Sequence, residues 1–299
     1  MAEFFNSLTG RRGAMLTYTL KRLLQAALTV LAAAFLTFCL MNAVPGSPFY
    51  SDKYQNPALV AELEAKYGLD QSLPRQFVTY ISGFVQGDMG VSLKMQQGRP
   101  VAAIIADKLP LSARLGLVTL AWSIGAGLLL GLIAAGQHGR WPDALLRALA
   151  SLGVALPGFV LAALLLLLFG VVWRLLPTWG LASWQAYILP SLALGFYPMC
   201  HILRLSRAAM LETLSREHIR ASRLRGLSPG RVLFCHALKA ALLPVLTYAG
   251  PLAAYLITGS FVVESVFSIP GLGRYYVQSV LARDYPLVMA TTILLAAAL

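Results

Sequence analysis

The chain has 299 residues, of which 58% are hydrophobic and only 12% are charged, and its formal net charge is +12. Soluble domains carry about 25% charged residues and cannot bury so much apolar surface, so this composition indicates a protein that crosses a membrane several times. It excludes a disordered chain, a coiled coil and a disulfide-stapled scaffold. The excess of Lys and Arg is typical of cytoplasmic loops under the positive-inside rule, so no nucleic-acid partner is expected.

The N-terminal part is predicted to be an extension followed by a membrane anchor. Residues 1–14 precede a second plausible start at Met15 and carry no fold signal. The first apolar stretch, Leu23 to Val44, is too long for the hydrophobic region of a signal peptide, so an uncleaved spanning helix is expected. Residues 15–112 therefore comprise this helix and an outer, periplasmic segment. That outer segment, 45–112, has six basic and six acidic residues and is predicted to be a small folded cap.

The remainder, 113–299, is predicted to be a core of five more spanning helices. A span needs about 20 apolar residues, and by that length the spans run over 115–135, 148–173 (interrupted by Pro157-Gly158), 187–203, 242–263 and from near Pro286 to Leu299. The last has fourteen residues, or roughly 21 Å of helix, against a hydrocarbon core of about 30 Å. We therefore expect six transmembrane helices in an all-α fold, with the last one truncated.

The distribution of Lys and Arg among the short connections predicts the orientation. Segments 1–22, 136–147 and 204–239 together carry 14 of these residues, whereas 173–186 and 264–285 carry 3. Because basic residues concentrate on the cytoplasmic side, both termini are expected in the cytoplasm.

Ionisable side chains are almost absent from the expected spans. His201 lies beside Cys200 but has no second ligand at the i+4 position, so a polar residue facing the helix bundle is a better interpretation than a metal ligand. A pump driven by protons or sodium would place carboxylates near the membrane midplane. None occurs there, so the energy for transport is expected to come from elsewhere.

Glu264 is the other exception, at the outer end of the fifth span. It either lines an outer gate, meeting a cationic group of a substrate, or accepts hydrogen bonds from helix and loop. Ser260 and Phe261 are candidates for the same translocation path. The spans contain no converging nucleophiles, paired aspartates or metal ligands, and the chain has no Gly-x-x-x-x-Gly-Lys-Ser/Thr motif. We therefore expect neither an enzyme nor a bound cofactor or metal.

The inner loop, 204–244, has a pattern suited to docking. Arg216, Arg220 and Arg223 recur at i, i+4 and i+7, which predicts a basic stripe on one helix face. Apolar residues mark a second face: Leu211, Leu214, Ala221 and Leu224. Such a surface fits a soluble partner, and the alternative is a solvated loop held by anionic lipids.

The same loop is predicted to turn at Gly226. Glycine ends helices well because it tolerates a positive φ. Ser228 is then the expected N-cap of a second helix, with Pro229 at its first position. This second helix continues through His236 and Leu238 to the membrane.

These residues resemble a known family. The run 220–229 (RASRLRGLSP), followed by 236–239 (HALK) and 241–244 (ALLP), resembles the coupling motif of oligopeptide and dipeptide ATP-binding-cassette importer permeases. Arg220 and Ser222 depart from the usual first and third letters of that motif, Glu and Ala. Further stretches agree in the same order: Tyr18 with 21–24, 45–49, 67–70 with 87–92, and 259–273 with 283–285. The resemblance covers 15–299 and is closest to the first permease of an oligopeptide system.

The resemblance implies a type I importer permease in the bacterial inner membrane. Its expected partners are a homologous second permease, two cytoplasmic ATPases that hold ATP and Mg²⁺, an outer solute-binding protein, a peptide substrate and membrane lipid. The residues implied to couple to the ATPases are Arg216, Arg220, Ala221, Arg223, Gly226, Leu227, Ser228, His236 and Leu238. A permease of the same family for nickel, a heme precursor or a glycoside is the main alternative, and an ion-coupled carrier is a weaker one.

Overall fold

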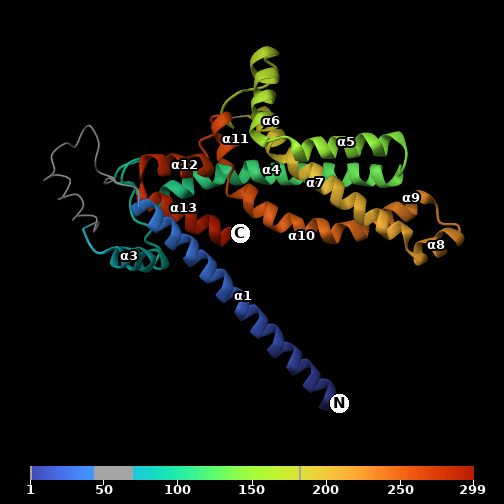
Figure 1. Cartoon of the computed structure of the whole chain (residues 1–299), viewed down its shortest axis with the longest axis horizontal. Coiled ribbons are helices and arrows are strands. Elements are labelled where there is room, and N and C mark those ends of the chain that lie inside the picture. The colour runs from blue at the N-terminus through green and yellow to red at the C-terminus, as the bar shows by residue number, and fades with distance from the viewer. Residues whose placement is uncertain (1, 44–69, 182) are drawn as a thin grey trace. The chain divides into compact units, whose positions relative to one another are not determined.

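The computed structural model describes residues 2–43, 70–181 and 183–299, without the side chains of 2–14, 16, 218, 220, 221, 223 and 229 (Figure 1). Within these residues every regular element is a helix, and the one β feature is an isolated bridge between Val91 and Pro100. The predicted all-α class is confirmed. The chain divides into two compact units, 1–105 with 276–299, and 106–275.

The first unit is built on two helices from opposite ends of the chain. Its helices are α1 (Ala2–Ala43), α3 (Leu73–Val85) and α13 (Tyr285–Ala298). Helix α1 packs along α13, and Phe38 and Met289 share a buried cluster with the aromatic residues of α3. Helix α1 begins at Ala2, so residues 2–14, predicted to carry no fold signal, continue the helix. Residues 44–69 of the predicted outer cap lie outside the described residues.

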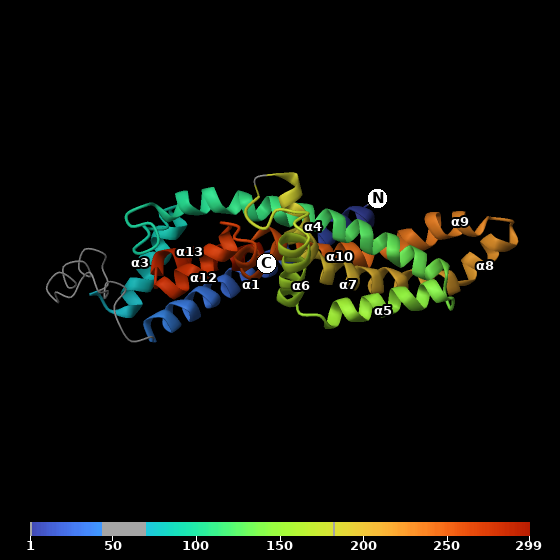
Figure 2. The same cartoon turned by 90° about the horizontal axis from the view of Figure 1, so that it is seen from above.

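The second unit is a bundle around one central helix, α7. Its helices are α4 (Val101–Gly136, which starts in the first unit), α5 (Trp141–Ala155), α6 (Gly158–Leu165), α7 (Ile188–Ser215), α8 (Glu217–Leu224), α9 (Pro229–Val232), α10 (Leu238–Ile257), α11 (Phe261–Val266) and the start of α12 (Leu272–Ala282). Helix α7 packs against α5, α6 and α10. Figure 2 shows α4 and α5 on either side of it.

Helix α7 approaches its neighbours closely because they present glycine. Gly127 and Gly131 of α4 are four residues apart and face α7. A Cβ added at Gly127 would lie 2.7 Å from Ile202, and one added at Gly131 would overlap Ser206. Small residues at this spacing let membrane helices pack backbone to backbone. Gly153 of α5 is equally crowded, against Cys200. These contacts fix where α4 and α5 cross α7.

Two predicted spans are broken in the structure. The stretch 148–173 falls in two helical segments that meet at 102°: α5, and α6 with the π-helix Leu166–Val172 that continues it. The predicted interruption is confirmed, but a single straight span is not, because Leu156 before Pro157 takes an extended backbone (ψ 120°). Helix α10 ends at Ile257 rather than 263, since Gly259 takes φ +99° and α11 starts anew. Four described helices are long and apolar enough to cross a membrane, or five if the bent pair is one span, and α13 is a shorter apolar helix. A count of six stays a prediction.

Candidate functional site

The candidate site is the segment that joins α7 to α10, which we call the coupling segment (residues 216–238). It comprises α8, a turn, α9 and a π-helical stretch, Leu233–Ala237, that runs directly into α10. Figure 1 shows α8 and α9 at the end of the second unit, beyond α7 and α10. The segment is therefore a helix–turn–helix that projects from the end of a bundle, as the sequence predicts. The π-helical stretch was not predicted.

The turn of the coupling segment is formed by its own residues. Gly226 has φ +84°, and the Leu227 N–H donates to the Ser222 carbonyl at 3.3 Å, the bond pattern of a Schellman helix end. Nothing lies within 4 Å of a Cβ added at Gly226, so its positive φ, and not crowding, requires glycine. The Arg231 N–H donates to Ser228 Oγ at 3.4 Å, which confirms the predicted N-cap.

The predicted basic stripe is wrong at Arg216. Helix α7 ends at Ser215, and Arg216 has an extended backbone (ψ 148°) before α8 begins. Arg216 is therefore not on one helix face with Arg220 and Arg223, whose side chains, like that of Ala221, lie outside the described residues. Arg216 instead pairs with Glu212 at 2.8 Å in the last turn of α7. Both side chains are exposed, so the pair contributes about 0.3–0.5 kcal/mol.

The apolar residues of the coupling segment divide into a buried and an exposed set. Ile219 is fully buried, whereas Leu224 at the end of α8 is 90% exposed. Leu211 and Leu214 pack at the end of α7, in a cluster that includes Leu238. Leu227 and His236 are half-buried. Beside this cluster, a largely apolar cavity of about 810 Å³ opens between the ends of α4 and α7 and the π-helical stretch. The segment thus combines a hydrogen-bonded turn, an exposed apolar tip and an adjacent cavity.

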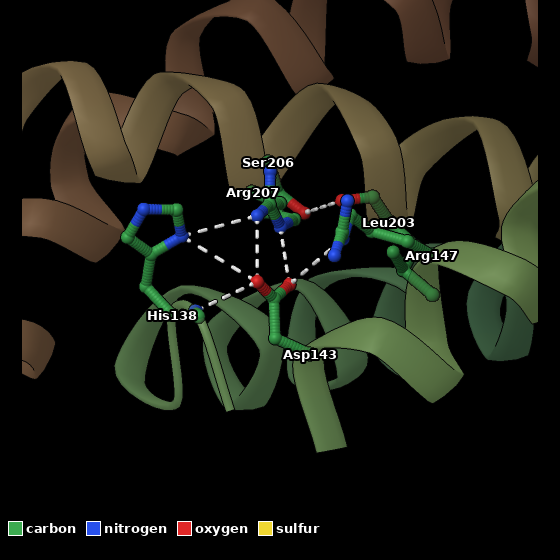
Figure 3. Close-up of polar contacts among 7 residues, drawn as sticks. His138, Asp143, Arg147, Leu203, Ser206 and Arg207 are labelled. Atoms are coloured by element: carbon green, nitrogen blue, oxygen red, sulfur yellow. Dashed lines mark hydrogen bonds and ion pairs between the residues drawn. The ribbon is translucent and has the colours of Figure 1, made fainter. Parts of the chain in front are cut away.

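A charged cluster that sequence reasoning missed connects α5 to α7 near this end of the unit (Figure 3). Asp143, at the start of α5, is 1% exposed. Arg207 of α7 donates to both its carboxylate oxygens, at 2.7 and 2.8 Å. The Gly139 N–H donates to Oδ2 at 3.1 Å, and His138 Nδ1 lies 3.4 Å from the same oxygen. Arg147 lies 3.8 Å from Oδ1. Bidentate Arg–carboxylate pairs combine strength with fixed geometry, so this pair defines the α5–α7 crossing.

A local signal for Asp143 was present in the sequence. Trp141-Pro142-Asp143 places a proline and an acid in the first turn of a helix, where the N–H groups favour negative charge. The partner had no such signal, because Arg207 is 64 residues away in the chain. It counted only as one more basic residue of the inner loop.

Glu264 is enclosed in a second buried cluster of the same unit. It is fully buried, and its Oε1 accepts a hydrogen bond from Ser112 Oγ at 2.7 Å while Oε2 accepts the Arg274 N–H at 2.8 Å. Ser112 Oγ also accepts the Leu272 N–H at 2.8 Å. These contacts are those of the second role that the sequence left open, hydrogen bonding to helix and loop; the gate role of Glu264 stays a prediction. Ser260 is buried and Phe261 is 40% exposed, and their place on a translocation path stays a prediction.

The first unit has a comparable buried carboxylate, Asp284, between α12 and α13. It accepts a hydrogen bond from Ser92 Oγ and the N–H groups of three successive residues, 93–95, at 3.0–3.1 Å. Nearby, Tyr80 of α3 donates to the Pro286 carbonyl at 3.2 Å. Burial, with a smaller contribution from Asp88, raises the pKa of the Tyr80 phenol, which stays protonated as a donor. Asp284 thus holds the loop before α4 against the start of α13.

Comparison with known proteins agrees with this architecture. A family model described as the inner membrane component of binding-protein-dependent transport systems matches residues 127–299, and the model of the N-terminal part of such membrane components matches 15–116. The chain belongs to this family. The resemblance noted in the sequence is confirmed, and with it a type I importer permease that crosses the bacterial inner membrane several times.

Curated relatives of this permease cover nearly all of it. It is 40% identical to the dipeptide transport system permease protein DppB of Bacillus subtilis (strain 168), over 93% of this chain and 90% of the relative. It is also 40% identical to the oligopeptide transport system permease protein OppB of Haemophilus influenzae, over 94% and 92%. The glutathione transport system permease protein GsiC of Escherichia coli O6:H1 is 39% identical, over 94% and 92%.

Proposed function

We propose that this permease passes dipeptides or oligopeptides from an outer solute-binding protein into the cytoplasm, driven by two ATPases beneath it. The peptide assignment is supported by the names of the relatives, which specify dipeptides, oligopeptides and glutathione, itself a tripeptide. The observation that carries the ATP-driven mechanism is the coupling segment, whose Gly226 turn and capped second helix project from the end of the bundle. Such a projection would transmit displacement from a partner to the helices that it joins, α7 and α10.

The proposed source of energy is ATP bound by the partner subunits. It contains no phosphate-binding Gly-rich motif of the Walker A type, so ATP and Mg²⁺ are assigned to the partner subunits. Leu224, at the exposed tip of α8, supplies an apolar contact, and the cavity beside α9 offers room for a partner side chain. Closure of the ATPases around ATP would move this segment and favour the outward-open state. Hydrolysis would restore the inward-open state.

The remaining assembly is proposed in the same way. The lengths of the apolar stretches support six spans, and the basic residues of the inner segments support cytoplasmic termini. Helix α1 exposes a run of large apolar side chains, Leu20, Leu23, Leu24, Leu28, Leu31, Phe35, Leu36 and Leu40. Such a surface requires lipid or another membrane subunit, and a homologous second permease would complete the complex.

Two experiments test this function. Gentle purification from native membranes, with mass spectrometry of the associated proteins, should recover a second permease and two ATPases. Reconstitution with those partners and the solute-binding protein should give ATP-dependent uptake of a labelled tripeptide. Recovery of an intact chain alone, able to move solute without ATP, would overturn the proposal in favour of an ion-coupled carrier. Uptake of nickel, a heme precursor or a glycoside, but not of peptide, would overturn the substrate.

A matched pair of glycine variants tests the coupling segment itself. Gly226→Ala places an L-residue at φ +84°, and Gly180→Ala places one at φ +68°, and neither new Cβ meets an atom within 4 Å. Each substitution costs about 1 kcal/mol of local strain. We expect only Gly226→Ala to lower peptide-stimulated ATPase activity and uptake. Equal effects of the two variants, or none, would show that the turn does not couple.

A further inference from the structure

One face of α7 carries a run of polar and aromatic side chains. Tyr197, His201 and Arg204 follow one another at i, i+4 and i+7, so they lie on one side of the helix. Tyr197 is 46% exposed, His201 is half-buried and Arg204 is exposed. All three lie within the membrane-span candidate Trp184–Ser215. His201 lies within the predicted span 187–203 and Arg204 directly follows it; an ionisable group within a span is costly and marks a functional site.

The His201 ring is held between two tyrosines. The ring of Tyr197, one turn earlier, is stacked on it at 6.3 Å and 19°, and that of Tyr248 on α10 lies at 4.5 Å and 36°. Tyr248 thus extends the polar stripe from α7 to its neighbour. The three rings offer two hydroxyl groups and two imidazole nitrogens along a partly exposed surface.

The stripe borders a cavity of about 720 Å³ between α5 and α7. Its lining includes His201 and Arg204 on α7, and Arg147 and Ser151 on α5, with apolar side chains around them. Binding pockets for small molecules span about 300–1,000 Å³, so a short peptide segment fits. Positive charge predominates in the cavity lining, which includes three arginines and no acidic residue. The nearby carboxylate of Asp143 already pairs with Arg207 and, more weakly, with Arg147. In the described part of the chain no carboxylate pairs with Arg204.

We propose that this stripe and cavity form part of the translocation path, and that Arg204 binds the C-terminal carboxylate of the transported peptide. The inference rests on the peptide-importer function proposed above. Peptides of every sequence share main-chain amides and a terminal carboxylate, which is ionised at neutral pH. A guanidinium recognises that carboxylate through two parallel hydrogen bonds. Hydroxyl and imidazole groups pair with main-chain amides. Recognition is therefore independent of side-chain sequence.

An anionic lipid headgroup carries similar chemistry but fits the stripe less well. From Arg204 to Tyr197 the stripe follows α7 for about 10 Å at 1.5 Å per residue. The interfacial layer that holds headgroups is only about 5–8 Å thick on each side of the bilayer. The polar surface therefore extends beyond the depth of a headgroup, as a path for a polar solute requires.

Cysteine accessibility tests the path. In the complete complex, with the three native cysteines replaced by serine, Tyr197→Cys and Arg204→Cys should react with a water-soluble maleimide. Addition of tripeptide, binding protein and ATP should slow that reaction several-fold. Leu117→Cys on α4 is the control, because Leu117 is 53% exposed but lies within an apolar span and away from the cavity. Labelling of Leu117→Cys alone, or no protection by peptide, would overturn the path.

Charge removal tests the role of Arg204. We expect Arg204→Gln to lower the maximal rate of tripeptide uptake roughly tenfold, as for the loss of a charge-assisted hydrogen bond. Arg204→Lys should retain most of the rate. Arg174→Gln, which removes the same charge from an exposed site that lines neither this cavity nor the one beside the coupling segment, should match the wild type. A normal rate for Arg204→Gln, while the wild-type complex transports peptide, would overturn the carboxylate assignment and leave the importer function intact. Full loss of uptake by the wild type in neutral lipid would favour the headgroup instead.

Discussion

The ion pair of Asp143 and Arg207 is a buried interaction whose loss should destabilise the second unit. Asp143→Asn keeps the size of the side chain but removes its charge, and one oxygen becomes an amide that cannot accept from the guanidinium. Arg207, only 17% exposed, would then be left without a carboxylate partner. The crossing of α5 over α7 would lose its main polar contact.

The expected magnitude follows from burial and geometry. Removing one partner of a buried, hydrogen-bonded ion pair costs 3–5 kcal/mol, and a hydrogen bond to a charged group about 1.5–3 kcal/mol. Because Arg207 remains partly accessible to water, we expect the lower range, about 2–3 kcal/mol. For a domain of this size that corresponds to a fall in the unfolding midpoint of roughly 5 °C or more.

Thermal unfolding of the purified complex in detergent measures this loss. Glu212→Gln is the matched control, because it neutralises an acid paired at the same 2.8 Å distance but 70% exposed. It should cost no more than about 0.5 kcal/mol. The double variant Asp143→Asn, Arg207→Gln should be less destabilised than the sum of the single variants, since the two side chains are coupled. Equal costs for Asp143→Asn and Glu212→Gln, or strict additivity, would refute the structural role of the pair.

Two further predictions concern the other buried carboxylates. Gly259→Ala should destabilise the chain by more than about 3 kcal/mol, because the new Cβ would lie 2.5 Å from Glu264 Oε1 at a position with a positive φ. Gly250→Ala, in an open helical position, should be neutral or stabilising. The unfolding midpoints of the two variants, compared with that of the wild type, test this difference. Asp284→Asn should release the 92–95 loop, seen as faster hydrogen exchange of its three bonded amides, and unchanged protection would contradict the bonding described.

Local features of the chain were predictable because their causes are local. The turn after α8 at Gly226 and the cap at Ser228 depend on backbone conformation and on residues three to five positions away. The interruption at Pro157 follows from the steric demands of proline. The apolar stretches gave the approximate helices, although α4 and α7 extend beyond the predicted spans into polar sequence.

The same local reasoning failed where no single residue type marks the helix boundary. A regular helix through Arg216 would have aligned three arginines, and nothing in its side chain forbids that. In the structure α7 nevertheless ends at Ser215, and Arg216 has an extended backbone before α8. The end of α10 near Gly259 is similar, since that glycine fits a space bounded by Glu264, Ser112 and Gly273.

The sequence by itself determined that this chain is a multi-pass membrane permease and where its coupling segment turns, since composition, span length, family motifs and capping residues are properties of short stretches. The tertiary structure alone decided how three scarce carboxylates are used. Asp143, Glu264 and Asp284 bind partners 64, 152 and about 190 residues away. A buried charge is stable only beside a matching donor, and folding, not sequence proximity, brings that donor to it.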